Sequence, residues 1–347
     1  MEQHSLDTQN MAKAIYDFSV QLKDAFEIGQ KFTSSETNSD IRNVVVAGMG
    51  GSAIGGDVCK ALLINELTVP MVVSRNYTLP NWVNEHTLLI CSSYSGNTEE
   101  TLSAFEDAKA KGALICGIST GGSLTEKLKE INADMIQIPS GLQPRAALAY
   151  SVVPMLSILH SFRLIGDEVI TQVGKAFNLL SEKCETYSKE DVSNPTYLLA
   201  QKIYQTLPII YGTTETTSIA ASRMKGQLCE NGDMLAYNNE LPEMNHNEIV
   251  GWENNSELFN QFSVVWLTDE QDHDRVQLRQ DITQKLINMK NVEQHTISVA
   301  GSNRTERFLH LIHFGDWVSY WCAILHGTDP SPVLPIEQLK ADLAEKG

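Results

Sequence analysis

The feature that most constrains this fold is a short strand in which apolar residues follow one another without alternation. Asn43–Ala47 reads Asn-Val-Val-Val-Ala and runs directly into a glycine-rich turn at 48–56, after which a helical pattern extends to about Leu63. A strand that is apolar on both sides must be covered on both sides, as in the interior of a parallel sheet. The pattern therefore predicts an α/β fold with helices on both faces of the sheet.

The alternation of strand, turn and helix is found in two stretches of the chain, one before and one after a long helical region at about 146–193. A chain of 347 residues is long enough for two domains that each bury a core. We expect two doubly wound α/β domains with mainly parallel sheets, at 1–160 and 161–347. The expected strands are 43–47, 70–73, 87–91, 113–118, 135–138, 207–211, 263–267 and 293–299, and the expected helices are 11–32, 99–111, 123–131, 195–205, 218–228, 277–289 and 305–325.

Composition excludes several classes of function. The net charge of −17 argues against a nucleic-acid partner, because such a chain has no positive field to attract a polyphosphate. The first ten residues are polar and no apolar run reaches membrane-spanning length, so we expect neither a signal peptide nor a membrane association. The six cysteines form no Cys-x-x-Cys pair and are interpreted as reduced residues of a cytoplasmic protein.

Two turns that follow expected strands are rich in small and hydroxylated residues. The first reads Gly-Met-Gly-Gly-Ser-Ala-Ile-Gly-Gly from residue 48, and the second reads Cys-Ser-Ser-Tyr-Ser-Gly-Asn-Thr-Glu-Glu from residue 91. Each turn leads into a helix, where backbone amides and hydroxyls favour an anion, and parallel sheets bind ligands at this edge. The turns predict a phosphate site. Its expected ligands are Gly51, Ser52, Ser93, Ser95 and Thr98.

Two other interpretations of these turns compete with phosphate binding. Hydroxyl residues before a helix commonly cap it, and Thr98 alone fits that role. The first turn also fits the Gly-x-Gly-x-x-Ala pattern of dinucleotide-binding folds, which is weak when it stands alone. The second expected strand ends in Val-Val-Ser-Arg75 rather than in an acidic residue. That ending leaves an NADP-type cofactor possible, but the serine-rich second turn has no place in such a scheme.

Four further residues are candidates for chemistry. Glu230 falls at the end of an expected helix, where the negative helix pole favours proton uptake and suits a general base. His246 lies between two asparagines in a segment without apolar periodicity. Arg145 follows the fifth strand and is a candidate to stabilise an oxyanion. Each has an ordinary alternative as a solvated surface residue, and Lys340 near the chain end would by itself be read in that way.

A metal site is the less favoured interpretation of a third cluster. His310, His313 and Asp316 share a helix face by spacing. Their neighbours include Leu309, Ile312, Phe314 and Trp317, which favour a packed helix instead.

Together these segments resemble a known family. The two turns and Gln-Pro-Arg-Ala at 143–146 resemble the sugar isomerase (SIS) domain, which implies flavodoxin-like domains. Lys-Gly-Gln-Leu-Cys-Glu at 225–230, Asn-His-Asn-Glu at 245–248 and Asp-Pro-Ser-Pro-Val at 329–333 with Leu-Lys at 339–340 resemble the bifunctional phosphoglucose/phosphomannose isomerases. The resemblance covers nearly the whole chain, apart from the N-terminal helix and residues 163–192.

The resemblance implies a cofactor-free and metal-free enzyme that interconverts hexose 6-phosphates. Glu230 would move a proton between C1 and C2 through a cis-enediolate, and Arg145 would stabilise that anion. His246 and Lys340 would help to open the sugar ring, with His246 supplied by the partner subunit of a homodimer. The serine-rich turns would hold the substrate phosphate.

Two other functions remain open at this stage. A non-catalytic SIS domain that senses a sugar phosphate is one, although such proteins usually carry a DNA-binding helical domain, and one N-terminal helix in an acidic chain does not provide it. An NADP-linked dehydrogenase ranks behind both. Replacement of Glu230 by Gln separates the first two, because a sensor keeps its function whereas an isomerase loses turnover.

Overall fold

A computed structural model of the protein describes residues 3–36 and 40–346. By its internal contacts the chain forms two compact units. The five-strand unit consists of Asp17–Glu182 and Val299–His310, and the four-strand unit consists of Met1–Tyr16, Lys183–Ser298 and Leu311–Gly347. The domain limits expected from the sequence, 1–160 and 161–347, remain a prediction about which segments fold together.

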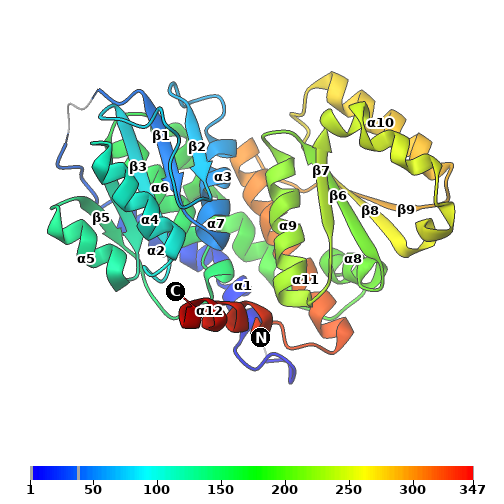
Figure 1. Ribbon diagram of the computed structural model, residues 1–347. Coiled ribbons are helices and arrows are strands. Elements are labelled where there is room, and N and C mark those ends of the chain that lie inside the picture. Colours follow the sequence, from blue (N-terminus) through cyan, green and yellow to red (C-terminus); the bar gives the residue numbers. More distant parts are fainter. Residues whose placement is uncertain (1–2, 37–39, 347) are drawn as a thin grey trace. The chain divides into compact units, whose positions relative to one another are not determined.

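The five-strand unit is a fully parallel sheet in the order β2-β1-β3-β4-β5. This is the flavodoxin-like order of doubly wound folds. Figure 1 shows helices over both faces of this sheet. The strands of this unit are β1 Asn43–Ala47, β2 Met71–Ser74, β3 Thr87–Ser93, β4 Leu114–Ser119 and β5 Asp134–Gln137. Its helices are α2 Phe18–Gly29, α3 Gly50–Leu62, α4 Glu99–Ala110, α5 Gly122–Glu130, η1 Pro144–Ala146, α6 Ala149–Ser161 and most of α7 Glu168–Tyr187.

The core of this unit explains why its strands lack alternation. Every residue of the central strand β3 is buried, and Leu89 and Cys91 pack with Phe105 of α4 and Leu124 of α5. Because helices cover both faces, a polar residue on either side of β3 would lose its contact with water. The continuous apolar pattern correctly predicted the strands of this sheet.

The four-strand unit repeats the arrangement with one strand fewer. Its parallel sheet has the order β7-β6-β8-β9, which again places the second strand outside the first. The strands of this unit are β6 Leu207–Thr213, β7 Tyr237–Leu241, β8 Phe262–Leu267 and β9 Glu293–Ile297. Its helices are α1 Met11–Tyr16, α8 Pro195–Ile203, α9 Thr217–Gly232, α10 Asp274–Asn288, most of α11 Arg304–His326 and α12 Leu334–Lys346. Three 3-10 turns follow β7, namely η2 Glu243–His246, η3 Glu248–Glu253 and η4 Ser256–Gln261.

Strand β7 was not predicted from the sequence. It reads Tyr-Asn-Asn-Glu-Leu and lies at the edge of the sheet, with only Leu241 buried. An edge strand is paired on one side and needs no continuous apolar run, so its signal is weak. Pairing with β6, which joins Ile209 to Tyr237 and Thr213 to Leu241, fixes it in place.

A buried ion pair lies inside the four-strand unit. Arg223 of α9 donates from Nε and Nη2 to the two carboxylate oxygens of Asp316 on α11, at 3.0 and 2.7 Å. Both side chains are almost fully buried, and burial raises the pKa of Asp316 although Arg223 opposes the shift. Such a bidentate pair fixes the packing of the two helices.

The three α11 residues for which a metal site was the less favoured interpretation take part in the packing of the helix. The Nδ1 atom of His310 lies 2.8 Å from the Ala300 carbonyl oxygen, and the Trp317 indole donates to Nε2 of His313 at 2.7 Å. Asp316 is committed to Arg223. Among the described residues no group of three or more His, Cys, Asp or Glu side chains is placed to hold a metal ion. The packed-helix interpretation accounts for these residues.

The six cysteines are free thiols, and all except Cys229 are buried. Burial raises the pKa of Cys59 and Cys91, which makes these thiols unreactive core residues. None of the helices in the described part of the chain combines the length and apolar character that a bilayer crossing requires.

Candidate active site

The first glycine-rich turn joins β1 to α3 in the five-strand unit. Helix α3 begins at Gly50, so Gly51 and Ser52 lie in its first turn. Gly50 has a φ of +50°, which explains a glycine at the point where the chain turns from strand into helix. Ser52 is buried, with 7% of its surface exposed. The Ser52 amide donates to the Met49 carbonyl oxygen at 3.1 Å, while amides at the start of a helix that have no helical partner suit an anion.

The second turn, between β3 and α4, is organised by its own hydroxyl groups. The hydroxyl oxygens of Ser93 and Thr98 lie 2.8 Å apart, and Ser93 also accepts from the Gly96 amide at 3.1 Å. Ser95 accepts from the Asn97 amide at 3.2 Å. Thr98 occupies the N-cap position of α4, but its side chain makes no capping hydrogen bond. Capping by Thr98 therefore does not explain this turn.

The two turns lie beside each other at the carboxyl edge of the sheet. Strands β1 and β3 are neighbours, with Ala47 opposite Cys91. A Cβ atom added to Gly48 would lie 2.9 Å from the Ser92 carbonyl oxygen and 3.2 Å from Cβ of Ser52. The structure thus brings the predicted phosphate-binding residues of both turns into one neighbourhood, with Ser93 buried and Ser95 exposed.

Arg145 belongs to the same neighbourhood. It lies in η1, and a Cβ atom on Gly51 would be 2.5 Å from the Pro144 carbonyl oxygen and 3.5 Å from the Arg145 amide nitrogen. Only 5% of Arg145 is exposed, so its interpretation as a solvated surface cation is wrong. The glycine at position 51 is required because the chain of η1 packs directly against it.

The dinucleotide interpretation finds little support in the surroundings of Arg75. Its guanidinium forms an ion pair with the carboxylate of Asp57 on α3. A positive charge that is already paired is poorly placed to receive a 2′-phosphate.

Glu230 lies in the four-strand unit, in the last turn of α9. The helix ends at Gly232, and Asp233 follows in the left-handed conformation with a φ of +49°. The predicted position of Glu230 near the negative pole of a helix is therefore seen in the structure, with its side chain half-buried.

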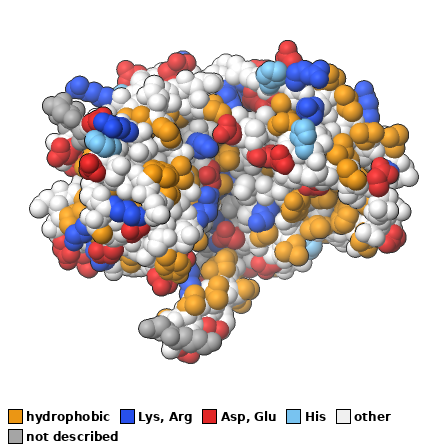
Figure 2. All heavy atoms as spheres, turned by 45° about the horizontal axis from the view of Figure 1, so that its top comes forward, with side chains coloured by type: hydrophobic (Ala, Val, Ile, Leu, Met, Phe, Trp, Pro, Cys, Tyr) orange, Lys and Arg blue, Asp and Glu red, His pale blue; other side chains and the backbone are white. Residues whose placement is uncertain are grey.

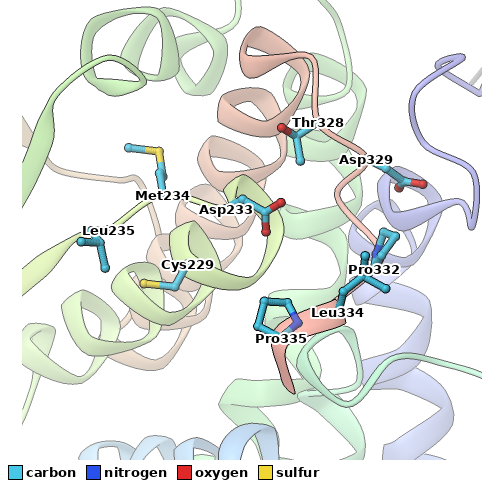
Figure 3. Close-up of a pocket in the computed structure, with 9 residues that line it drawn as sticks. All are labelled: Cys229, Asp233, Met234, Leu235, Thr328, Asp329, Pro332, Leu334 and Pro335. Carbon is cyan, nitrogen blue, oxygen red and sulfur yellow. The ribbon is translucent and has the colours of Figure 1, made fainter. Parts of the chain in front are cut away.

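A pocket of about 460 Å³ lies beside the end of α9. Volumes of this order are typical of small-molecule sites. Figure 3 shows Cys229 in the last turn of α9, Asp233 directly after that helix, and Leu334 and Pro335 at the start of α12. The sequence did not indicate Asp233 as part of a pocket, because a helix-ending residue gives no such signal. The residues that line the pocket are Cys229, Asp233, Met234, Leu235, Thr328, Asp329, Pro332, Leu334 and Pro335.

His246 is exposed, but the chain around it is held firmly. Asn245 donates to Thr283 Oγ1 on α10 at 2.8 Å, and Asn247 donates to Glu243 at 2.7 Å. His246 itself ends the 3-10 turn η2. An exposed imidazole on a fixed turn can face a ligand or a second chain without rearrangement of the backbone.

Glu248 completes this support and was given no role in the sequence analysis. Its carboxylate accepts from the Tyr211 hydroxyl and from Asn239 Nδ2, the latter at 2.5 Å. Tyr211 keeps its proton, since burial raises its pKa. In the sequence this glutamate belongs to the Asn-His-Asn-Glu segment at 245–248. Nothing in that segment indicates the hydrogen bonds that the glutamate makes with β6 and β7.

Lys340 is exposed on α12. Glu230, His246 and Lys340 therefore belong to the four-strand unit, whereas Arg145 and the hydroxyl-rich turns belong to the five-strand unit.

Comparison with known proteins relates these features to enzymes of sugar phosphates. Residues 192–343 match the family model of the bacterial phospho-glucose isomerase C-terminal SIS domain. The bifunctional phosphoglucose/phosphomannose isomerase of Caldicellulosiruptor bescii is 44% identical over 96% of this chain and 99% of its own. The enzyme of the same name from Aquifex aeolicus is 39% identical over 87% and 90%.

Solved structures show the same fold at low sequence identity. The C-terminal domain of glucosamine-fructose-6-phosphate aminotransferase from Francisella tularensis gives a TM-score of 0.68 with 13% identity, over 95% of this chain and all of that one. Tagatose-6-phosphate ketose/aldose isomerase from Escherichia coli gives 0.62 with 13% identity, over 95% and 96%. With 44% identity along almost the whole of both chains, the protein belongs to the bifunctional phosphoglucose/phosphomannose isomerase family of SIS-domain proteins.

Proposed function

We propose that the protein catalyses the reversible isomerisation of glucose 6-phosphate and of mannose 6-phosphate with fructose 6-phosphate. The observation that carries this proposal is the near full-length similarity to a bifunctional phosphoglucose/phosphomannose isomerase. The two hydroxyl-rich turns at the carboxyl edge of the five-stranded sheet support it, since they suit a phosphate monoester.

In this proposal the phosphate of the substrate is bound by Gly51, Ser52, Ser93, Ser95 and Thr98. Backbone amides in the first turn of α3 and hydroxyls of the second turn donate hydrogen bonds to the phosphate oxygens. The mutual bond between Ser93 and Thr98 holds these hydroxyls in place before the substrate arrives. Such an arrangement needs no lysine in the cradle and is compatible with the negative charge of the whole chain.

Glu230 is the proposed general base. It removes a proton from C2 of the open-chain aldose and delivers a proton to C1, while the proton of the C2 hydroxyl passes to O1 and the electron pair moves through a cis-enediolate. Glucose 6-phosphate and mannose 6-phosphate differ only in configuration at C2, so both give the same enediolate. The guanidinium of Arg145 stabilises the negative charge of that intermediate.

His246 and Lys340 are proposed to open the sugar ring by proton transfer at the ring oxygen and the anomeric hydroxyl. We propose further that the active form is a homodimer and that His246 acts in the site of the partner subunit. The exposed position of His246 on a fixed turn supports this role. The reaction involves no redox cofactor or metal ion, and we place it in the cytoplasm, in accord with six free thiols.

A coupled assay with purified protein tests the proposal. Fructose 6-phosphate is supplied, and glucose 6-phosphate and mannose 6-phosphate are detected separately, with and without EDTA. We expect both products, formed at the same rate with the chelator. Formation of glucose 6-phosphate alone would restrict the substrate range, and absence of both products would favour a sugar-phosphate sensor.

A further inference from the structure

Helix α10 presents a continuous row of large apolar side chains to the solvent. Leu278, Ile282, Leu286 and Met289 are 46%, 49%, 40% and 69% exposed. Their spacing of four, four and three residues places them on one side of the helix. Figure 2 shows hydrophobic side chains gathered on the part of the surface where Figure 1 draws α10.

The opposite side of α10 is already occupied by the core of its own unit. Gln280, Thr283 and Ile287 are buried, and Ile287 packs in the cluster that contains Trp252 and Trp266. A helix that buries one face and exposes a second apolar face has two surfaces to cover. The outer face therefore needs a partner that is not part of this unit.

Charges beside the apolar row fit a second copy of the same helix. Asp281 and Lys285 lie on one flank of the row and are both exposed. Within residues 3–36 and 40–346 no ion pair of 4.0 Å or less is found for either of them, although they are four positions apart. Beside Ile282 this flank carries one negative and one positive charge, which makes that part complementary to itself, and the exposed Asp274 lies on the same flank at the start of the helix.

We propose that α10 is a homodimer contact, in which two copies of the helix pack antiparallel about a two-fold axis near Ile282. In that register Ile282 meets its own counterpart and Leu278 meets Leu286 of the second copy. Asp281 then lies within about 3 Å, along the helix axis, of Lys285 in the second copy, given a rise of about 1.5 Å per residue. The two-fold axis makes each contact occur twice.

This surface is linked to the proposed site. Thr283 on the inner side of α10 accepts a hydrogen bond from Asn245, the residue before His246. Packing of α10 against a second copy would fix the helix to which the His246 turn is attached. The inference takes its partner from the homodimer of the proposed function, but it is defined by α10 alone.

Sedimentation velocity of the full chain over a concentration series tests the surface. Ile282→Glu should raise the dimer dissociation constant by at least about 30-fold, because a buried hot-spot residue becomes an unpaired charge. Val20→Glu is the matched control, since Val20 is 62% exposed on α2 of the other unit, and it should leave the constant unchanged. Circular dichroism confirms that both variants are folded.

A charge exchange tests the register. Asp281→Lys should raise the dissociation constant about tenfold, because two like charges meet at each of two equivalent places. The double variant Asp281→Lys, Lys285→Asp should return it to within about threefold of the wild type.

The outcomes separate the surface from the function. A wild-type dimer that Ile282→Glu leaves intact would overturn the α10 surface and leave the homodimer standing. A wild-type monomer would overturn both the surface and the dimer. The isomerase assay on the same samples decides the activity independently, so a failure of the proposed reaction cannot be mistaken for a failure of the α10 contact.

Discussion

The two sheets share one strand order, yet the two units present their candidate residues differently. In the five-strand unit Ser52, Ser93 and Arg145 are buried, and the hydroxyl-rich turn is tied together by its own hydrogen bonds. In the four-strand unit His246 and Lys340 are exposed. Local packing thus fixes these candidate residues of the five-strand unit, whereas His246 and Lys340 are left open to solvent. We propose that the five-strand unit holds the substrate phosphate and stabilises the enediolate, and that the four-strand unit supplies the groups that transfer protons.

Replacement of Glu230 tests that division with the largest expected effect. Glu230→Gln should lower kcat by a factor of about 10² to 10⁴, because a general base contributes that much, and should change KM by less than about threefold. Steady-state kinetics with both aldose substrates measures it. Glu257→Gln, at an exposed glutamate of the same unit, should have no effect. A KM effect without a kcat effect would assign Glu230 to binding instead.

The buried ion pair of Arg223 and Asp316 lies in the interior of the four-strand unit. Asp316→Asn leaves a buried guanidinium without its counter-charge, and should lower the free energy of unfolding by about 3–5 kcal/mol. Urea denaturation, followed by tryptophan fluorescence, measures the loss. Asp40→Asn removes an exposed partner of Arg42 and should leave the curve unchanged. Equal stability of the two variants would show that the buried pair does not determine the packing.

A substitution in the hydroxyl-rich turn between β3 and α4 should change KM rather than kcat. Ser93→Ala removes one donor to the phosphate and the partner of Thr98, so KM should rise about 10- to 100-fold, as expected for a hydrogen bond to a charged group. Competitive inhibition by inorganic phosphate should weaken in parallel. Ser103→Ala, on the helix that follows the turn, is the control. If phosphate inhibition were unchanged, Ser93 would not contact the phosphate.

The smallest expected effect is a pH dependence confined to the five-strand unit. Lys111 Nζ donates to Asp107 at 2.9 Å, and this bond holds the pKa of Asp107 below its ordinary value of 3.8. The unfolded chain therefore binds a proton at higher pH than the folded chain does. The stabilisation is complete above about pH 4 and is lost as the pH falls through the folded-state pKa. Asp107→Asn should flatten the acid side of the stability curve, and an unchanged slope would refute the linkage.

Whether a strand or a site residue can be predicted from the sequence depends on whether the residues that determine it are close together in the chain. Strand β3 and the turn after it could be read from the sequence, because burial on both faces forces a continuous apolar run. Strand β7 could not, since an edge strand is held by its register with β6 rather than by its composition. The burial of Arg145, which excludes its alternative as a surface residue, could not be predicted, because it follows from the packing of Pro144 on Gly51, far away in the sequence.

The reacting groups show the same limit more strongly. The position of Glu230 at a helix end was readable, but nothing in the pattern around it distinguishes it from other glutamates, and its role comes from the family resemblance. The support of His246 by Asn245 and Glu248 depends on partners on α10, β6 and β7. Such non-local hydrogen bonds leave no periodic signal in a single sequence.

The central claim, proton transfer by Glu230 through an enediolate, is tested most directly by isomerisation of fructose 6-phosphate in D₂O. The account predicts deuterium at C2 of the glucose 6-phosphate and mannose 6-phosphate formed, detected by NMR, and loss of this incorporation with Glu230→Gln. Deuterium incorporation and turnover that are both unchanged in the Glu230→Gln variant would contradict it.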